Sequence, residues 1–354
     1  MTAIRYPLII FIALLSASCG KEGSDQEDFD YKVVYVSSKQ ETDTSWSGGT
    51  VYVIDMDEFE VEAILNIEAG AILKFKEGAT MIVRESGKIN CLGVSAHPVI
   101  FTSLLDDSHG GDTNEDGSAT RPAAANWGKI LLENESSAFA YCHFFYGGGG
   151  TRPTTLEAAN VRVQILNCIF AYNTGGMSDG RYYGALDISR ASDNSHVLDN
   201  GFHNNYMPLT TQTRINLRSG HYFSNPENPS EKNTIMGIFL QGDTDRNINL
   251  AETEVPYVFL NPSLHIKHSF GLNDDVIMKM PEDGSITIYQ GGAMFYTEKA
   301  IITSFKDDLS GGDTNGDGNN SVPAKGDWIG IYDTRFPGEE FYVPGPSIRY
   351  AQFP

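Results

Sequence analysis

A stretch of twelve residues occurs twice in the chain with few changes, as DDSHGGDTNEDG at 106–117 and as DDLSGGDTNGDG at 307–318. The offset of 201 residues continues without a gap to Trp127 and Trp328. The similarity extends on both sides, so that a unit of roughly 80 residues occurs twice. Such duplication predicts an architecture in which successive units stack and bury each other's apolar faces.

A finer repeat lies between the two copies. The segments YCHFFYG, NCIFAYN and DNGFHNN align on Phe144, Phe170 and Phe202, and Asn173 and Asn205 then share one turn position. The alternation of apolar and polar residues before these turns is typical of β-strands with one buried face. Because coils of a parallel β-solenoid stack about 4.8 Å apart, matching side chains recur at one position of successive coils. The spacing therefore predicts an all-β solenoid.

The stretch LNIEAGAILKFKEGATMIVRESGKINCLGVSAHPVIFTS at 65–103 resembles the opening coils of right-handed parallel β-helix proteins of the pectin-lyase-like class. Bacterial surface proteins of that group carry a stretch similar to TSxxDDxxGGDTNxDG followed by WxxI. The resemblance covers 50–150 and 256–354 well, and it covers 150–220 by the coil pattern alone. It implies a right-handed parallel β-helix of two stacked or bent segments.

The resemblance and the repeat together suggest three regions after the N-terminus. A first β-helix segment is expected over 46–220, a connecting loop region over 221–255, and a second, partly repeated segment over 256–354. The two prolines and many polar residues at 221–233 predict a loop there.

The N-terminus has the pattern of a targeting segment. Arg5 precedes a short apolar run, and small residues lead to Cys19, so residues 1–18 resemble a bacterial lipoprotein signal. The resemblance implies cleavage before Cys19 and lipidation of its thiol, with anchoring in the bacterial outer membrane and exposure at the surface. The alternative is an ordinary secretory signal with a chance cysteine. The polar, acidic stretch that follows is expected to form a flexible tether over 19–45.

The net negative charge of the chain limits the partners that it can bind. Removal of residues 1–18 removes Arg5, which leaves 24 Lys and Arg against 46 Asp and Glu. A chain of this charge repels nucleic acid and anionic lipid headgroups, so its membrane contact is expected through the lipid alone.

The other three cysteines, Cys91, Cys142 and Cys168, lack the spacing of a metal cluster. We expect them to be small buried hydrophobic residues. The alternative is a disulfide between Cys142 and Cys168.

The duplicated stretch carries oxygen ligands at the spacing of a calcium loop. Asp112, Asn114 and Asp116 correspond to loop positions 1, 3 and 5 of an EF-hand, and Gly117 supplies the sharp turn. The second copy repeats this pattern with Asp313, Asn315, Asp317 and Gly318. Ligands that are all oxygen favour a hard cation, and Ca²⁺ is the expected one.

One part of the EF-hand is missing, because position 12 is an alanine in both copies. Asp106 and Asp107, together with Asp307 and Asp308, are retained in both copies and are predicted to complete the two shells. The alternative is a solvated acidic turn, since Asp, Asn and Gly are also common in turns.

Function is the least constrained property. The run of short motifs typical of polygalacturonases is not found, and Arg181, Arg190, Arg214 and Arg218 show no basic cluster in sequence. Such arginines more often pair with neighbours such as Asp187 and Asp193. We therefore expect a calcium-stabilised surface module for adhesion or for binding a polysaccharide or a host-surface glycan, without catalysis. The alternative is a polysaccharide lyase or glycoside hydrolase of the pectin-lyase-like class.

Overall fold

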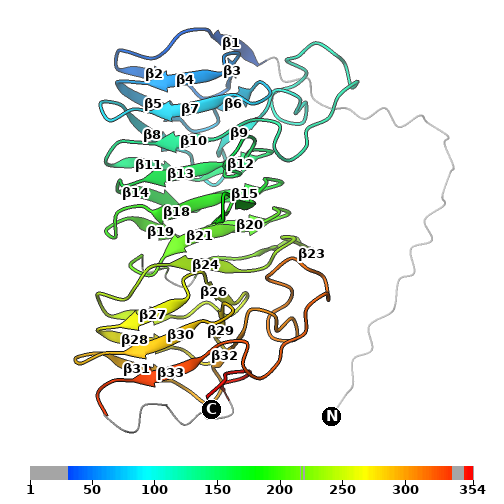
Figure 1. The fold of residues 1–354 in the computed structure, drawn as a ribbon. Coiled ribbons are helices and arrows are strands. Elements are labelled where there is room, and N and C mark those ends of the chain that lie inside the picture. Colours follow the sequence, from blue (N-terminus) through cyan, green and yellow to red (C-terminus); the bar gives the residue numbers. More distant parts are fainter. Residues whose placement is uncertain (1–30, 216, 218–219, 337–346, 354) are drawn as a thin grey trace, which may run out of the picture. The chain divides into compact units, whose positions relative to one another are not determined.

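Strands and turns build the described part of the chain. The computed structural model describes residues 31–215, 217, 220–336 and 347–353, and no helix occurs among them (Figure 1). Accordingly, these residues include no helix long and apolar enough to cross a bilayer. Cys19 and the segment 1–18 lie outside the described residues, so their predicted processing stays a prediction.

Three long parallel sheets run along the molecule, and two short ones follow. Sheet A consists of β1 (Lys32–Val36), β3 (Thr50–Ile54), β6 (Ile72–Phe75), β9 (Val99–Ser103), β12 (Cys142–Phe145), β15 (Ile169–Ala171) and β20 (Gly201–His203). Sheet B consists of β4 (Glu58–Val61), β7 (Thr80–Val83), β10 (Ile130–Leu132), β13 (Leu156–Ala159), β18 (Leu186–Arg190), β21 (Leu209–Gln212), β24 (Ile238–Gln241), β26 (Tyr257–Phe259), β29 (Ile277–Met280) and β32 (Ile301–Ser304).

Sheet C consists of β2 (Thr44–Trp46), β5 (Ile64–Glu68), β8 (Lys88–Leu92), β11 (Ser137–Ala140), β14 (Val163–Leu166) and β19 (His196–Leu198). Sheet D consists of β25 (Ile248–Leu250), β28 (Ser269–Leu272) and β31 (Ala293–Tyr296), and sheet E of β27 (Ser263–Ile266), β30 (Ser285–Ile288) and β33 (Gly330–Asp333). Two antiparallel hairpins lie outside these sheets, β16 (Gly176–Ser178) with β17 (Arg181–Tyr183), and β22 (Ser224–Asn225) with β23 (Asn228–Lys232).

The chain passes from sheet A to sheet B to sheet C and then begins the next coil. Thus β6, β7 and β8 form one coil, and β9, β10 and β11 form the next. The pairing is parallel, with Leu73 of β6 opposite Phe101 of β9. An all-β chain whose coils stack in this way is a parallel β-helix, and the predicted fold class is confirmed.

The interior is filled by columns of like side chains. The rings of Phe101, Phe144, Phe170 and Phe202 stack in turn, with centroids 4.7 to 5.3 Å apart. These side chains are fully buried. The alignment of Phe144, Phe170 and Phe202 is thereby confirmed. Offset stacking of aromatic rings at the coil spacing adds a specific attraction to the burial of apolar area.

A ladder of buried asparagines closes the turn after sheet A. The Asn173 Nδ2 donates to the Phe144 carbonyl at 2.8 Å and to Asn205 Oδ1 at 3.0 Å. The Asn205 Nδ2 donates in the same way to the Phe170 carbonyl and to Asn233 Oδ1. Each amide therefore satisfies buried backbone groups that the turn leaves unpaired. The predicted pair is confirmed, and Asn233 extends the ladder.

Cysteines form a third column. Cys91, Cys142 and Cys168 are buried free thiols, and the Cys142 Sγ lies 3.2 Å from the Cys91 Sγ. Burial raises the pKa of all three thiols, which keeps them protonated and unreactive. The expectation of small buried residues is met, and Cys142 is not bonded to Cys168.

The sheets change partners in the second half of the chain. Sheets A and C end at β20 and β19, and sheets D and E begin at β25 and β27. Sheet B alone continues through the change, because β24 pairs with both β21 and β26. The change lies between the end of β20 at His203 and the start of β25 at Ile248.

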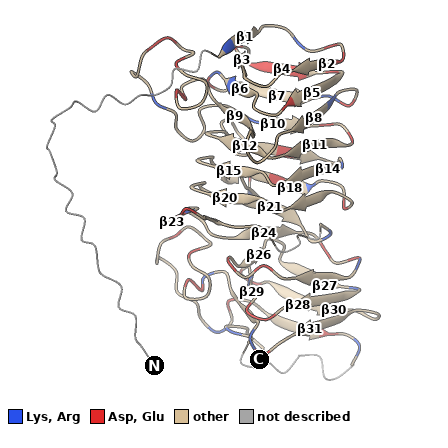
Figure 2. Cartoon of the chain, turned by 180° about the vertical axis from the view of Figure 1, so that it is seen from behind, with Lys and Arg blue, Asp and Glu red and all other residues tan. Residues whose placement is uncertain are grey.

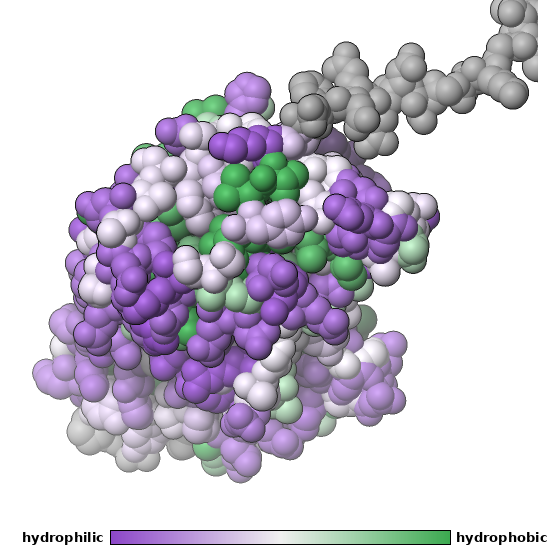
Figure 3. Space-filling model, turned by 90° about the horizontal axis from the view of Figure 1, so that it is seen from above, coloured by the Kyte–Doolittle hydropathy of each residue, from purple (hydrophilic) through white to green (hydrophobic). Residues whose placement is uncertain are grey.

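Two local expectations differ from the structure. The stretch at 19–45 was expected to be a tether, yet β1 begins at Lys32, because KVVYV offers β-branched and aromatic residues to the edge of sheet A. The expected loop at 221–233 contains the hairpin of β22 and β23. In the view from the N-terminal end, hydrophilic residues predominate and the most strongly apolar patch lies near the centre (Figure 3).

The asparagine ladder generates a prediction. We expect Asn205→Ala to lower the free energy of unfolding by about 3 kcal/mol, because buried backbone groups of two coils lose their partners. Urea denaturation measures this change. The exposed Asn194→Ala is the control and should change stability by less than about 0.5 kcal/mol. Equal midpoints for both variants would show that the ladder does not hold the coils together.

Candidate metal centres

The duplicated stretches form two long loops that leave the β-helix and return to it. Loop 1, residues 104–129, joins β9 of sheet A to β10, and loop 2, residues 305–329, joins β32 of sheet B to β33 of sheet E. The two copies thus follow strands of different sheets. Both loops nevertheless project from the same edge in Figures 1 and 2, and both carry acidic segments.

A buried carboxylate fastens each loop where it leaves the sheet. The Thr102 hydroxyl donates to Asp106 Oδ2 at 2.6 Å, and the Thr303 hydroxyl donates to Asp307 Oδ2 at 2.7 Å. Both aspartates are 1% exposed. Burial alone would raise the pKa of Asp106, but hydrogen bonds from His109, Ser108 and Thr102 hold that pKa below its usual value.

A buried lysine lies beneath each loop. Lys74 on β6 and Lys279 on β29 have no exposed surface, and their ammonium groups donate to the carbonyls of Gly111 at 2.5 Å and Gly312 at 2.6 Å. Desolvation lowers the pKa of both lysines to about 8, against the opposing effect of the loop aspartates. Sequence reasoning missed this pair. The signal was a lysine at the same place in AILKF and VIMKM, two otherwise apolar strands.

Each loop also covers an apolar patch on the outer face of a sheet. Loop 1 lies over Val51, Val53, Ile72 and Ile100 of sheet A. A Cβ on Gly110 would come within 2.5 Å of the Val51 side chain, and Gly110 has a φ of 78°, so both space and conformation require glycine there. Loop 2 contacts a second patch, formed by Met207, Ile235, Phe239 and Val258, through Phe305.

Three carboxylates converge in each loop. Asp107, Asp112 and Asp116 bring one oxygen each to within 4.8 Å of one another. The same arrangement occurs in loop 2, with Asp308, Asp313 and Asp317. We call these groups triad 1 and triad 2. Backbone amides hold them in place, as where the amide of Gly117 donates to Asp112 at 2.8 Å and that of Gly318 donates to Asp313 at 2.7 Å.

The triads contain acceptors without donors. Oδ1 of Asp107 and Oδ1 of Asp308 are buried and accept no hydrogen bond. Burial, followed by repulsion from Asp112, raises the pKa of Asp107, and burial with repulsion from Asp313 does the same for Asp308. A raised pKa means that the fold disfavours the ionised carboxylate, so a positive charge in the triad would relieve this strain.

The ten predicted metal ligands fall into three groups. Six of them form the two triads. Asn114 and Asn315 adjoin the triads, because their amides donate to Asp116 at 2.8 Å and to Asp317 at 3.0 Å, and Asn114 Oδ1 has no partner. Asp106 and Asp307 lie outside the triads and bind the strand threonines, so they fasten the loops at their bases.

A third acidic stretch does not converge. Asp243 contacts His265 at 3.2 Å, and Asp245 pairs with Arg214 at 3.1 Å. Arg246 pairs with Asp193, a residue that sequence reasoning assigned to nearer arginines. Arg218 lies outside the described residues. Asp245 and Asp193 thus have arginine partners within the protein, and Asp243 has a histidine partner.

One cluster has the residue types of a polysaccharide-cleaving site. Glu157 on β13 and Asp187 on β18 are directly opposite each other on neighbouring strands. Lys129 donates to Glu157 at 2.5 Å, and Arg190 binds its other oxygen. These bonds hold the pKa of Glu157 low against its burial, whereas burial raises the pKa of Asp187. Glu157 is 1% exposed and Asp187 2%, so neither carboxylate presents itself to a polymer.

Comparison with known proteins adds no relative. No family model matches the chain, and neither a curated protein nor a solved structure matches it.

The strained carboxylates generate a prediction. We expect Asp107→Asn to raise the melting temperature in chelator, because it removes a charge that the fold disfavours, and to reduce the gain on adding calcium. Asp308→Asn should behave alike in loop 2. The control, Asp57→Asn, changes a side chain 93% exposed and should leave both values unchanged. Calorimetry with chelator and with calcium measures these shifts, and a lower melting temperature of Asp107→Asn in chelator would contradict the repulsion argument.

Proposed function

We propose that the protein is a calcium-stabilised β-helix module of the bacterial cell surface, which binds glycans and does not cleave them. Calcium would occupy triad 1 and triad 2 and hold the two long loops against the sheets. The N-terminal pattern supports a lipid anchor at Cys19 in the outer membrane. The resemblance to the pectin-lyase-like class supports a polysaccharide or host-surface glycan as the ligand.

The observation that carries the calcium proposal is the recurrence of one electrostatic arrangement at two places. The three carboxylates of each triad and the buried lysine beneath it carry a combined charge of about −2, and a buried oxygen of Asp107 or Asp308 has no donor. A divalent cation would balance this charge, and oxygen ligands suit Ca²⁺. Asn114 Oδ1 and Asn315 Oδ1 lie beside the triads and could supply further oxygen ligands.

The burial of Glu157 and Asp187, the residues of the type that cleaves polysaccharides, favours glycan binding over glycan cleavage. A glycosidase needs two carboxylates on either side of the scissile bond, and a lyase needs a base that reaches the sugar ring. The alternative of a lyase or hydrolase rests on the Glu157–Asp187 pair, which the surrounding side chains cover. A displayed scaffold with cation-ordered loops requires no such pair.

The stability test separates the cation proposal from an acidic turn. Calcium at millimolar concentration should raise the melting temperature of the full chain by a few degrees over chelator, because binding to the folded state alone stabilises it by mass action. The double variant Asp112→Asn/Asp313→Asn should lose this shift. Identical melting curves of the wild type in calcium and in chelator would refute the cation proposal.

The activity test separates binding from cleavage. The full chain is incubated with immobilised plant, algal and host polysaccharides, and both retention and new chain ends are recorded. We expect retention without new ends. Cleavage that Glu157→Gln abolishes would establish the enzymatic alternative instead.

A further inference from the structure

A row of hollows follows one corner of the β-helix, where the chain turns from sheet B to sheet C. Three adjoining hollows of about 550, 530 and 340 Å³ lie along this corner. The first two share Asn160, and the last two share Asp193 and Arg214. We call the whole the corner trough; its main lining segments are 85–88, 133–135, 160–161, 189–198, 212–214 and 246–247.

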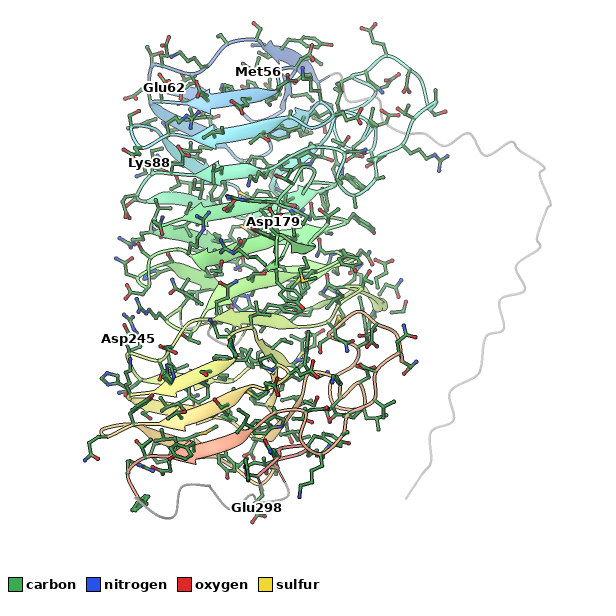
Figure 4. All side chains as sticks on the ribbon, viewed as in Figure 1. Met56, Glu62, Lys88, Asp179, Asp245 and Glu298 are labelled. Atoms are coloured by element: carbon green, nitrogen blue, oxygen red, sulfur yellow. The ribbon has the colours of Figure 1, made fainter. Side chains whose placement is uncertain are left out.

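The corner trough runs along the axis on which the coils stack. Its six lining segments belong to successive coils, and at a strand spacing of about 4.8 Å it is roughly 24 Å long. It lies away from the metal loops, because Lys88, which lines it, and Asp245, which pairs with Arg214, lie on the edge opposite the loops (Figure 4). A ligand in the trough would therefore be an extended chain that touches neither triad.

Hydroxyl, amide and guanidinium groups line the middle of the trough. Asn160, Ser192 and Gln212 contribute polar side chains there, beside Arg190. Such groups offer both donors and acceptors at short intervals. They match a ligand with many hydroxyl groups.

The arginines of the trough are already paired with carboxylates. Arg214 contacts Asp245 at 3.1 Å, and Arg246 contacts Asp193. The side chains of both arginines remain more than 40% exposed, so each guanidinium keeps N–H donors for a ligand. Since their charge is balanced, these arginines favour a neutral ligand over an anion.

Other ligand classes fit less well. Glu85, Glu133 and Glu135 outnumber Lys88 at the N-terminal end of the trough, so the excess of negative charge there disfavours an acidic polymer. The net charge of the chain repels nucleic acid in the same way. A peptide usually docks through buried aromatic or aliphatic anchors, and the central hollow offers mostly polar groups.

We infer that the corner trough binds a neutral oligosaccharide, extended along the axis of the β-helix, without the participation of calcium. This inference rests on the proposed glycan-binding function. It adds where the glycan binds, that the glycan is uncharged, and that its binding does not require the metal loops.

The test uses the full chain on an array of neutral and acidic oligosaccharides, with calcium and with chelator, below the melting temperature. Ser192→Trp fills the trough without removing an ion pair, and its control, Ser37→Trp, adds the same bulk to an exposed residue elsewhere. Gln212→Ala/Arg214→Ala removes two trough donors, and its control, Arg121→Ala/Gln164→Ala, changes the same residue types outside the trough.

The inference predicts that both trough variants bind neutral oligosaccharides at least tenfold more weakly than their controls, and that chelator leaves the wild-type affinity unchanged. Wild-type binding that the trough variants retain would overturn the inference and leave the proposed function standing. Binding of acidic glycans alone, or binding that chelator abolishes in the folded protein, would also overturn it. A wild type that binds no glycan would overturn both.

Discussion

The structure depends on the parallel pairing of each coil with its neighbours. A single coil of three short strands cannot bury its inward face, and its backbone groups find partners only in the coils on either side. Side chains at one position are therefore held at the coil spacing, which produces the columns of phenylalanine, asparagine and cysteine. The same repetition leaves the outer faces and corners free to carry different chemistry.

The two loops show how an acidic excursion can be held on such a framework. Each loop combines an outer apolar patch, a threonine-bound aspartate at its base, and a lysine wholly withdrawn from water. Burying an unpaired ammonium group is costly, and the carbonyl of Gly111 or Gly312 with the nearby carboxylates offsets that cost. The lysine cancels only part of the charge of each triad. This remainder is the physical basis of the proposed calcium dependence.

We propose different roles for the two loops and for the corner trough: the loops contribute to stability, and the trough binds the ligand. The proposed cation sites lie along one edge, and the proposed glycan surface lies along the opposite one (Figure 4). Sheet B, continuous from β4 to β32, links the coils of both halves. A loss of cation would thus loosen the loops before it reached the trough, because most of the parallel hydrogen bonds do not involve loop residues.

The sequence by itself determined the all-β coil repeat, the alignment of Phe144, Phe170 and Phe202, and the acidic loops, because these features recur at fixed spacing. Tertiary structure decided which carboxylates meet. Asp106 and Asp107 are adjacent in sequence, yet the strand end draws Asp106 to Thr102 and leaves Asp107 in triad 1. It also placed Lys74 beneath Gly111, 37 residues later in the chain, and it placed the second copy on a different sheet. The pairings between neighbouring coils join residues 18 or more positions apart, and where no repeat marks them, as in the loops, no local pattern specifies which residues will face each other.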